Sequence, residues 1–346
     1  MTPSMQAFRI ERPGETAFIE VPRPEPGPGE VLLRVERVGF CGSDLSSFRG
    51  SNPLVSYPRI PGHEIAATVV KVPDQAAGAP RVGTPVTVVP YTACGRCAAC
   101  RRGRSNACQN NQTLGVQRDG AFAEFIAVPW EKVLPAPLLA SELALVEPLS
   151  VGAHAVARGR IAEPDTVVVL GCGMIGLGAI AAAALGRRAT VIAVDLAPEK
   201  LALARAAGAR EVIAAGSESV PDRVRALTGG HGPDVVIEAV GSVVTYQLAV
   251  QLAAFAGRVV YIGYGKEPVP YETKLFVQKE LDILGARNAT SEDFAQVVTM
   301  LREGRYPSGA TITRTVPFAE AGRALAEWAA DPSSTTKIQV IAPQGR

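Results

Sequence analysis

Four cysteines lie within a short stretch of the chain, at Cys94, Cys97, Cys100 and Cys108. The spacing is C-x2-C-x2-C-x7-C, and the short intervals let a tight loop direct successive sulfurs toward one point. Four thiolates close a tetrahedral shell around zinc and leave no open position, which is typical of a structural zinc site. Basic residues inside the loop favour thiolate over thiol. The spacing therefore predicts a structural zinc site, with an iron–sulfur cluster or free surface thiols as the alternatives.

A glycine-rich turn offers a second kind of chemistry. Residues 171–176, GCGMIG, stand between the apolar run TVVVL and an Ala-rich helical pattern that reaches residue 186. A second apolar run, TVIAV, follows and ends at Asp195. The order strand, G-x-G-x-x-G, helix, strand, acid is typical of dinucleotide binding.

Each position of this turn has a mechanical role. Gly171 allows the tight turn, Gly173 lets a pyrophosphate approach the backbone, and Gly176 lets the helix pack closely on the strand. The amides at the helix start, which include Met174 and Ile175, face the phosphates. We therefore expect these residues to bind the cofactor.

The acid at the end of the second run discriminates between cofactors. Asp195 can accept hydrogen bonds from both ribose hydroxyls, whereas it would repel a 2′-phosphate. The next four residues, LAPE, include no basic side chain that could offset that repulsion. The sequence therefore predicts NAD as the cofactor.

Two later apolar runs end in turns that should also reach the cofactor. The first is VIEAVG at residues 236–241, and the second is YIGYG at residues 261–265. The carboxyl ends of parallel strands border the crevice of a dinucleotide-binding sheet. We therefore expect Val240, Ile262 and Gly263 to contact the cofactor.

Length and composition limit the remaining possibilities. A chain of 346 residues predicts two domains, and 47% hydrophobic residues are enough for a sizeable core. The net charge of +2 gives no indication of nucleic-acid binding, and the first 15 residues lack the apolar region of a signal peptide. Residues 166–186 could span a bilayer by length, but five glycines and the buried strand that follows favour globular core. We expect a cytoplasmic protein that binds neither membrane nor nucleic acid, in which six cysteines serve metal binding or catalysis rather than disulfides.

The pattern of residue types along the sequence changes at two positions. Short strands broken by Pro and Gly fill residues 31–39, 64–72, 84–90 and 121–129, which predicts a β-rich domain. From about residue 151, Ala-rich helical segments alternate with short apolar strands, which predicts an α/β fold with a doubly wound parallel sheet. After about residue 284 we expect helices at 291–304, with Ser291 as the N-cap, and at 318–332, then a strand at 337–342. The predicted domains are 1–150 with 287–346, and 151–286.

Several segments in one order carry a family resemblance. They are CGSD at residues 41–44, PGHE at 61–64, the cysteine loop, EPLSVGAHA at 147–155 and GCGMIG. Together they resemble the zinc-dependent medium-chain dehydrogenase family over essentially the whole chain, and most closely its sorbitol, threonine and sugar-acid dehydrogenases. The resemblance implies a GroES-like catalytic domain at 1–150 and 287–346, and a Rossmann NAD-binding domain at 151–286.

The resemblance implies a catalytic zinc held by Cys41, His63 and an acidic residue, for which Glu64 and Glu147 are the candidates. In this subgroup the fourth position is shared among glutamate, water and substrate. Thiolate, imidazole and carboxylate are suitable ligands, and an open position distinguishes a catalytic zinc from a structural one. Such a zinc lowers the pKa of a bound hydroxyl, so that the alcohol carbon can pass hydride to the nicotinamide. Taken singly, each of these residues would also fit ordinary core packing.

The resemblance implies that Ser43 starts the proton relay from the alcohol. A serine hydroxyl suits this role because it can accept one proton while it passes on another. The alternative is a turn residue that caps the following helix. Many relatives carry a histidine five residues after the cysteine, where this chain has Ser46. Either a ribose hydroxyl with water, or His154, would therefore complete the route of the proton to solvent. His154 would equally fit a packed histidine on an apolar helix face.

Substrate residues are suggested by two segments. FRGSNPLVSYPRIPGHE resembles the bacterial sugar-acid branch, such as galactonate dehydrogenases, and makes Phe48 and Tyr57 candidates for the pocket wall, with core packing as the alternative. GARNAT resembles a segment that borders the active site in sugar-alcohol and sugar-acid relatives, which makes Arg287 and Asn288 candidates. An arginine can hold a carboxylate by paired hydrogen bonds, although contact with a cofactor phosphate or an internal salt bridge would also explain it.

The sequence thus predicts an enzyme that uses zinc and NAD to oxidise a secondary alcohol of a polyol, sugar or sugar acid to the ketone. A threonine-type amino-alcohol dehydrogenase shares every motif and is the alternative enzyme. A zinc-binding scaffold or redox sensor without catalysis is the alternative of another class, and it would be expected to have damaged ligands. The expected partners are a small-molecule alcohol, one catalytic and one structural zinc per chain, and further copies of the chain in a homotetramer, or otherwise a dimer.

Overall fold

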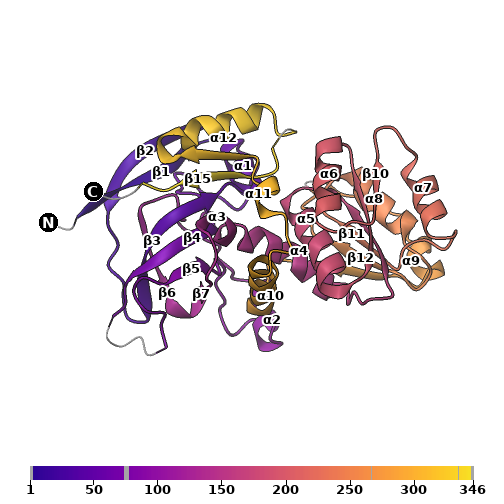
Figure 1. Cartoon of the computed structure of the whole chain (residues 1–346), viewed down its shortest axis with the longest axis horizontal. Helices are drawn as coiled ribbons and strands as arrows, with labels where there is room; N and C mark the ends of the chain where they lie inside the picture. The colour runs from indigo at the N-terminus through magenta and orange to yellow at the C-terminus, as the bar shows by residue number, and fades with distance from the viewer. Residues whose placement is uncertain (1–2, 74–77, 266, 334, 344–346) are drawn as a thin grey trace. The chain divides into compact units, whose positions relative to one another are not determined.

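The computed structural model describes residues 3–73, 78–265, 267–333 and 335–343 (Figure 1). The chain forms two compact units. The first unit comprises Met1–Glu147 together with Ile312–Arg346, and the second comprises Pro148–Thr311. Each unit has its own sheet, so each can be described by itself.

The first unit is built mainly of antiparallel strands. Strands β1 and β2 form a hairpin, and a larger sheet has the order β14-β15-β3-β4-β5-β7, with β6 paired to β3, among the residues described. Its strands are β1 Ser4–Arg12, β2 Glu15–Pro22, β3 Glu30–Gly39, β4 Glu64–Lys71, β5 Pro85–Val88, β6 Phe125–Pro129, β7 Val133–Pro135, β14 Arg314–Pro317 and β15 Ile338–Ile341. Its helices are α1 Gly42–Phe48, α2 Ala98–Arg101, α3 Ala140–Leu143 and α12 Ala321–Ala330, with short 3₁₀ turns at Ser105–Ala107, Trp130–Lys132 and Phe318–Glu320.

The second unit is a doubly wound α/β fold, as the alternating pattern predicts. Its parallel sheet has the order β10-β9-β8-β11-β12-β13 over the described part of the chain. The strands are β8 Thr166–Leu170, β9 Thr190–Asp195, β10 Glu211–Ala214, β11 Val235–Glu238, β12 Arg258–Tyr261 and β13 Asp282–Gly285. The helices are α5 Met174–Ala181, α6 Pro198–Ala206, α7 Val220–Leu227, α8 Val243–Leu252, α9 Lys274–Gln278, α10 Ser291–Arg302 and α11 Ser308–Thr311, and α4 Val146–Arg158 begins in the first unit and continues into the second.

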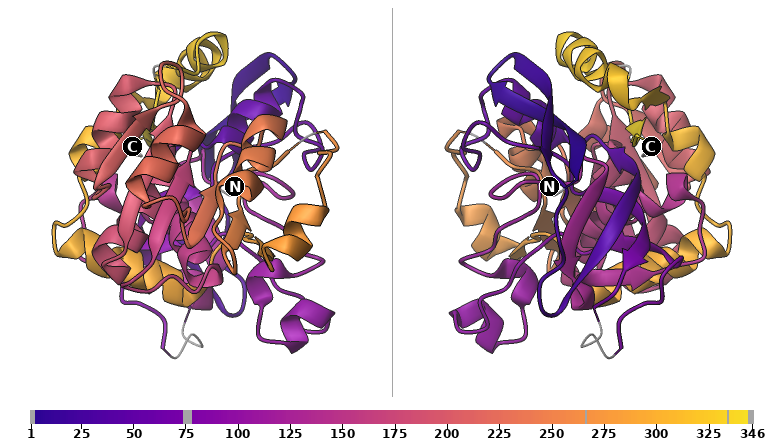
Figure 2. Two further views of the ribbon diagram at one scale, coloured as in Figure 1. Left: turned by 90° about the vertical axis from the view of Figure 1, so that its right-hand side faces the viewer. Right: turned by 90° about the vertical axis from the view of Figure 1, so that its left-hand side faces the viewer.

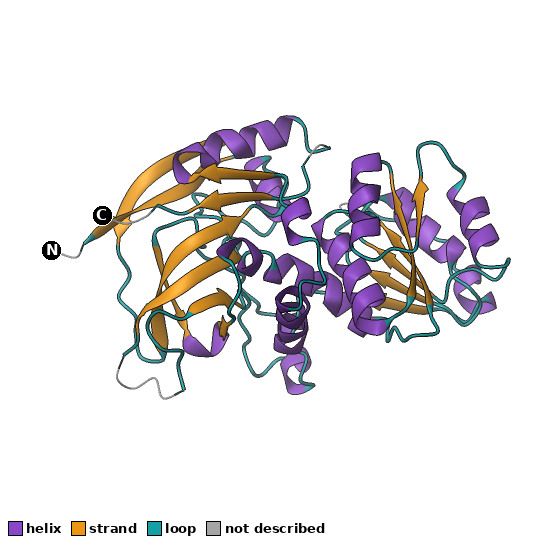
Figure 3. Ribbon diagram, viewed as in Figure 1, coloured by secondary structure: helices purple, strands orange, loops and turns teal. Residues whose placement is uncertain are grey.

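The strand sequences explain this architecture. The central strands β8 and β11 are buried along almost their whole length, and helices cover both faces of the sheet (Figure 3). Strands that are buried on both faces read as continuous apolar runs rather than alternating ones, which is why TVVVL and VVIE show no period of two. No helix among the described residues is both long and apolar enough to cross a membrane.

The second boundary between the units differs from the predicted one. The sequence pattern predicts that the α/β domain ends at residue 286, whereas residues 287–311 belong to the second compact unit. The reason is that α10 packs into that unit: His154 on α4 bonds Asp293 on α10, with 2.8 Å between Nδ1 and Oδ2, and both side chains are buried. The chain returns to the first unit only at Ile312. The first predicted boundary, after residue 150, lies three residues past Glu147.

The start of α10 also differs by one residue from the expected N-cap. Thr290, not Ser291, caps the helix, because its hydroxyl accepts a bond from the amide of Asp293 at 3.3 Å. The carboxylate of Asp293 in turn accepts the amide of Thr290, at 2.8 Å, which completes a capping box. His154 therefore stabilises a helix start rather than standing alone on an apolar face.

We expect His154→Leu to lower the free energy of unfolding by about 1–3 kcal/mol, because Asp293 would lose a buried hydrogen-bond partner. His154→Asn should recover much of that loss, since its amide nitrogen can take the place of Nδ1. Urea unfolding followed by circular dichroism measures both variants. Equal losses in the two variants would contradict a hydrogen-bonding role for this side chain.

Candidate active site and metal centres

Strand register brings the two sequence motifs CGSD and PGHE together. In the antiparallel pair β3–β4, Gly39 lies opposite Glu64. Cys41 follows the end of β3 by two residues, and His63 immediately precedes β4, so both side chains start from the same edge of the sheet. Two segments that are separated by a long loop in the sequence therefore become neighbours through backbone pairing.

The ligand atoms of Cys41, His63 and Glu64 all lie within 4.8 Å of one another. A thiolate, an imidazole and a carboxylate at this separation form a donor set that suits zinc and leaves a position for a further ligand. Two buried polar atoms beside them, Ser43 Oγ and His63 Nδ1, have no hydrogen-bond partner among the described residues. Buried polar groups are normally satisfied, so this is a place where a bound group would complete the site. The residues present fit a catalytic zinc.

Electrostatics around His63 reflect its acidic surroundings. Burial lowers the pKa of His63, but the adjacent Cys41 sulfur and the carboxylates of Glu147 and Asp44 outweigh it and hold that pKa well above its ordinary value. These groups stabilise the protonated imidazole because they create a negative electrostatic potential around it. The same field would favour a bound metal cation.

Glu64 has a partner that the sequence analysis did not identify. The ammonium group of Lys337 donates to both oxygens of Glu64, at 2.6 and 2.5 Å, and to the carbonyl of Phe40 at 2.9 Å. The side chains of this pair are only 3% and 1% exposed. Gly39 makes room for the carboxylate, because a Cβ at that position would stand 1.9 Å from Glu64 Oε2. Burial raises the pKa of Glu64 to about 7 against the opposing charge of Lys337.

Glu147, the other acidic candidate, is held differently. It lies in the first turn of α4, outside the group whose ligand atoms converge on Cys41 and His63. The hydroxyl of buried Tyr91 donates to its carboxylate. Burial and the charge of Glu147 raise the pKa of Tyr91 well above its ordinary value, so this partner stays neutral. Of the two glutamates, the structure brings Glu64 into the ligand group and leaves Glu147 beside it.

A third buried acid, Asp44, contacts the backbone beside Cys41 and His63. The carboxylate of Asp44 accepts the amide of Cys41 at 2.9 Å. Burial raises the pKa of Asp44, whereas His63 and the amides of Cys41 and Gly62 lower it. Asp44 therefore fixes the backbone on both sides of the ligand pair. Its position in the CGSD motif was visible in the sequence, but its role depends on contacts that only the fold creates.

The four cysteines of the loop also converge. The sulfurs of Cys94, Cys97, Cys100 and Cys108 all lie within 4.8 Å of one another, on a segment that carries α2 and projects as a separate lobe (Figure 2). The amides of Arg96 and Cys97 lower the pKa of Cys94 to about 6, whereas desolvation raises that of Cys100 to about 11. Backbone amides thus favour thiolate at part of the cluster before any metal binds. Four sulfurs at this separation fit a structural zinc.

The glycine turn of the second unit has the geometry that its three glycines suggest. Gly171 has φ +94°, which a residue with a side chain rarely adopts. A Cβ on Gly176 would stand 1.9 Å from the carbonyl oxygen of Gly171, so the helix can approach only without one. A Cβ on Gly173 would meet nothing within 4 Å. The space there is open, next to the start of α5, where Met174 is buried and Ile175 half-buried.

Asp195 is tied directly to this turn. Its carboxylate accepts the amide of Cys172 at 2.7 Å and the amide of Ala197 at 3.0 Å. The burial of Cys172, with the charge of Asp195, raises the pKa of that thiol, so this cysteine remains a protonated, packed residue. The turn, the open space beside Gly173 and the acid therefore form one unit that fits a dinucleotide. The neighbouring strand β11 is followed by Val240, which is 52% exposed. Strand β12 is followed by Ile262 and Gly263, which are both half-buried.

The predicted substrate residues lie in the two units separately. Phe48 and Tyr57 pack at the margin of the core of the first unit, and the Tyr57 hydroxyl donates to the carbonyl of Ser47. Arg287 is exposed and Asn288 half-buried, just after β13, and Asn288 has φ +54°. Phe48 and Tyr57 thus contact the core of the first unit, and a contact with substrate remains a proposal.

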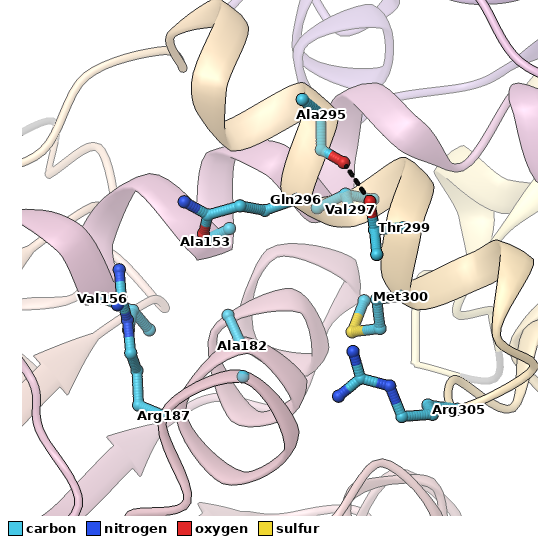
Figure 4. Close-up of a pocket in the computed structure, with 11 residues that line it drawn as sticks. Ala153, Val156, Ala182, Arg187, Ala295, Gln296, Val297, Thr299, Met300 and Arg305 are labelled. Atoms are coloured by element: carbon cyan, nitrogen blue, oxygen red, sulfur yellow. Dashed lines mark hydrogen bonds between the residues drawn. The ribbon is translucent and has the colours of Figure 1, made fainter.

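A surface cavity of about 370 Å³ lies elsewhere in the second unit, between α4, the π-helical turn Ala182–Gly186 and α10 (Figure 4). Exposed Arg187 and Gln296 stand at its wall, and Arg305 donates to the carbonyl of Leu185 there. None of its lining residues is a predicted ligand or cofactor residue. It is therefore distinct from the sites that the motifs predict.

Comparison with known proteins identifies the family. Residues 27–138 match the family model of the alcohol dehydrogenase GroES-like domain, and residues 175–303 match that of the zinc-binding dehydrogenases. An uncharacterised zinc-type alcohol dehydrogenase-like protein of Haemophilus influenzae is 34% identical over 99% of this chain and 100% of its own length. The chain belongs to the zinc-type medium-chain dehydrogenase family. It is an alcohol dehydrogenase with a GroES-like unit and a Rossmann unit.

Two other relatives of this dehydrogenase carry more specific descriptions. L-galactonate-5-dehydrogenase of Escherichia coli is 35% identical over 91% of this chain and 93% of its own. An alcohol dehydrogenase of Escherichia coli CFT073, solved with NADH, is 31% identical and superimposes with a TM-score of 0.90 over 98% of this chain and 99% of its own. The family resemblance read from the motifs is thus confirmed over nearly the whole length of the dehydrogenase.

We expect Lys337→Met to destabilise the dehydrogenase by about 3–5 kcal/mol, because it leaves the carboxylate of Glu64 buried without its counter-charge. Lys337→Met combined with Glu64→Gln should recover a large part of the loss, since both charges are then removed. Urea unfolding at neutral pH measures the two variants against wild type.

Lys71→Met provides the matched control, because it breaks an ion pair with Glu25 whose side chains are 54% and 62% exposed. An exposed pair of this kind should contribute little to stability, because water screens both charges. If Lys337→Met were as mild as this control, the buried pair would not be a stabilising element of the ligand cluster.

Proposed function

We propose that this dehydrogenase oxidises a secondary alcohol of a polyol, sugar or sugar acid to the ketone, with NAD as the hydride acceptor and two zincs per chain. The convergence of the Cys41, His63 and Glu64 ligand atoms within 4.8 Å carries the proposal. In it, these residues hold the catalytic zinc, and Cys94, Cys97, Cys100 and Cys108 hold the structural one. When bound, zinc supplies the Lewis acidity that lowers the pKa of an alcohol hydroxyl, and NAD takes up the hydride.

The residues around the open position have distinct tasks in this proposal. Ser43 Oγ, which has no partner among the described residues, would accept the proton of the alcohol hydroxyl while its own proton passes on to a ribose hydroxyl or water. Glu147 orients that hydroxyl or a water molecule, with its carboxylate held by the neutral Tyr91 hydroxyl. Lys337 compensates the charge of Glu64 and so keeps two adjacent carboxylates compatible in a buried site.

Asp195 supports the choice of NAD. Both of its oxygens already accept backbone amides, which holds the carboxylate at the edge of the glycine turn. A 2′-phosphate placed there would meet a fixed negative charge, and residues 196–199 supply no basic side chain. Gly171, Gly173, Met174, Ile175 and Gly176 would face the pyrophosphate.

Substrate binding and assembly are the finer parts of the proposal. The L-galactonate-5-dehydrogenase relative supports a sugar-acid or polyol substrate, for which Arg287 and Asn288 would supply polar contacts. A homotetramer, or otherwise a dimer, is supported by β13, an edge strand of the parallel sheet whose Ile283 is 40% exposed. An unpaired edge of this kind is a template for pairing with a second chain.

A substrate panel with zinc analysis tests the function. We expect sorbitol, threitol, galactonate and related acids, offered with NAD, to include a substrate that yields reduced nicotinamide by absorbance, in a protein with two zincs per chain. His63→Ala should abolish turnover and leave one zinc, whereas Cys97→Ser should lose the other zinc together with stability. Activity on L-threonine alone would indicate the amino-alcohol enzyme instead. A single zinc in wild type without turnover on any alcohol would overturn the proposal in favour of a scaffold.

Cofactor choice is tested at Asp195. We expect wild type to prefer NAD over NADP on the order of a hundredfold in kcat/KM, since like charges in contact cost several kcal/mol. Asp195→Asn removes the charge and keeps an acceptor for the amide of Cys172, so the preference should fall about tenfold or more. Glu199→Gln is the control for a general change of charge on the adjacent helix. An unchanged preference in Asp195→Asn would show that another residue selects the cofactor.

A further inference from the structure

A buried acid occupies the end of β11, in the middle of the parallel sheet. Glu238 is 0% exposed and lies within the run VIEAVG, of which only Val240 is a predicted cofactor contact. One carboxylate oxygen, Oε1, accepts three hydrogen bonds: from the amide of Val240 at 2.9 Å, the amide of Gly241 at 2.7 Å and the hydroxyl of Thr245 at 2.8 Å. These donors all belong to the turn after β11 and the first turn of α8.

The other oxygen of Glu238 faces the turn after β12. A Cβ on Gly263 would stand 2.6 Å from Oε2 and 2.3 Å from the amide nitrogen of Gly241. The main-chain carbonyl of Glu238 also accepts the amides of Ile262 at 2.9 Å and Gly263 at 3.2 Å. Oε2 itself has no hydrogen-bond partner among the described residues. One residue thus contacts both turns, and the absence of side chains at Gly241 and Gly263 lets the turns approach each other over it.

These turns stand beside the glycine loop. In the sheet order, β8, β11 and β12 are neighbours and run parallel, so their carboxyl ends share one edge. A Cβ on Gly171 would stand 2.6 Å from Cγ2 of Val240, which shows how closely the turn after β11 lies to the glycine loop. The carboxyl edge at this point of a doubly wound sheet is where a dinucleotide binds.

We propose that Glu238 is the positioning residue for the cofactor site: it fixes the two turns after β11 and β12 in the shape that receives the nicotinamide dinucleotide, without touching the cofactor itself. This inference rests on the proposed function. The carboxylate of Glu238 accepts hydrogen bonds from two amides and a hydroxyl that border the crevice, rather than from groups deeper in the sheet. Turns that are already ordered lose less conformational freedom when the ligand binds, which increases affinity. Val240 and Gly263 would then be presented to the cofactor by an acid that lies beneath both.

Removing this acid should weaken cofactor binding more than it changes alcohol binding or zinc content. We expect Glu238→Ala to raise the Kd for NADH, measured by fluorescence titration, about tenfold or more, with the KM for the alcohol and the zinc content close to wild type. Glu238→Gln keeps an oxygen that can accept the same three donors, so its Kd should stay within about threefold of wild type. Rescue by this conservative variant would indicate that the hydrogen bonds, rather than filled volume alone, carry the effect.

Asp165→Ala is the matched control, because Asp165 is also a buried acid of the same unit but lies before the start of β8, at the opposite edge of the sheet. It accepts the amide of Ala162 at 2.8 Å and Arg258 at 2.6 Å. We expect this variant to lower the unfolding temperature while its Kd for NADH stays near wild type. An equal rise of Kd in Asp165→Ala and Glu238→Ala would overturn the inference, and so would an unchanged Kd in Glu238→Ala.

Thr245→Val keeps the test decisive if Glu238→Ala does not fold. It removes one of the three donors and leaves both backbone amides, so a Kd for NADH raised about two- to fivefold is expected. A Thr245→Val protein with wild-type affinity would count against the inference. Failure of the proposed function is separately visible, because wild type itself would then bind neither NADH nor NADPH in the same titration.

Discussion

The antiparallel pairing of β3 with β4 sets Gly39 opposite Glu64, and the ligand cluster of the first unit depends on that register. Cys41 and His63 adjoin this pair, so backbone hydrogen bonds bring thiolate and imidazole to one edge of the sheet. A slip of one residue would turn the side chain of Glu64 to the other face. Gly39 leaves space for the Glu64 carboxylate in this register, because a side chain at position 39 would collide with it.

Charge is the second constraint on this cluster. The sulfur of Cys41 and the carboxylates of Glu64 and Glu147 lie close together in a largely buried place, which would be costly without compensation. Lys337 compensates Glu64 through a buried ion pair, whereas Glu147 receives only the neutral hydroxyl of Tyr91. The two glutamates are thus chemically different, although both are candidates for the same zinc. A bound cation would relieve the remaining negative charge.

In the second unit, the constraint is close approach of backbones rather than charge. The turns that follow β8, β11 and β12 pack against one another at Gly171, Gly241 and Gly263, where side chains would collide. Asp195 and Glu238 hold these turns by accepting backbone amides on either side of the glycine loop. A parallel sheet supplies the common edge, and two acids fix the loops that stand on it.

The sequence by itself determined what short chain segments dictate. Cys94, Cys97 and Cys100 stand three residues apart and Cys108 follows eight residues later, so a short loop can bring the four sulfurs to one point. A strand, a glycine turn, a helix and a second strand that ends in an acid likewise indicate one local fold. The doubly wound sheet and the family followed from such local patterns. Only the tertiary structure decided the pairing of Glu64 with Lys337, which are 273 residues apart, that of Tyr91 with Glu147, and the assignment of residues 287–311 to the second unit. Such contacts depend on where whole strands and helices pack, since nothing in the local sequence limits which distant side chain meets a buried charge.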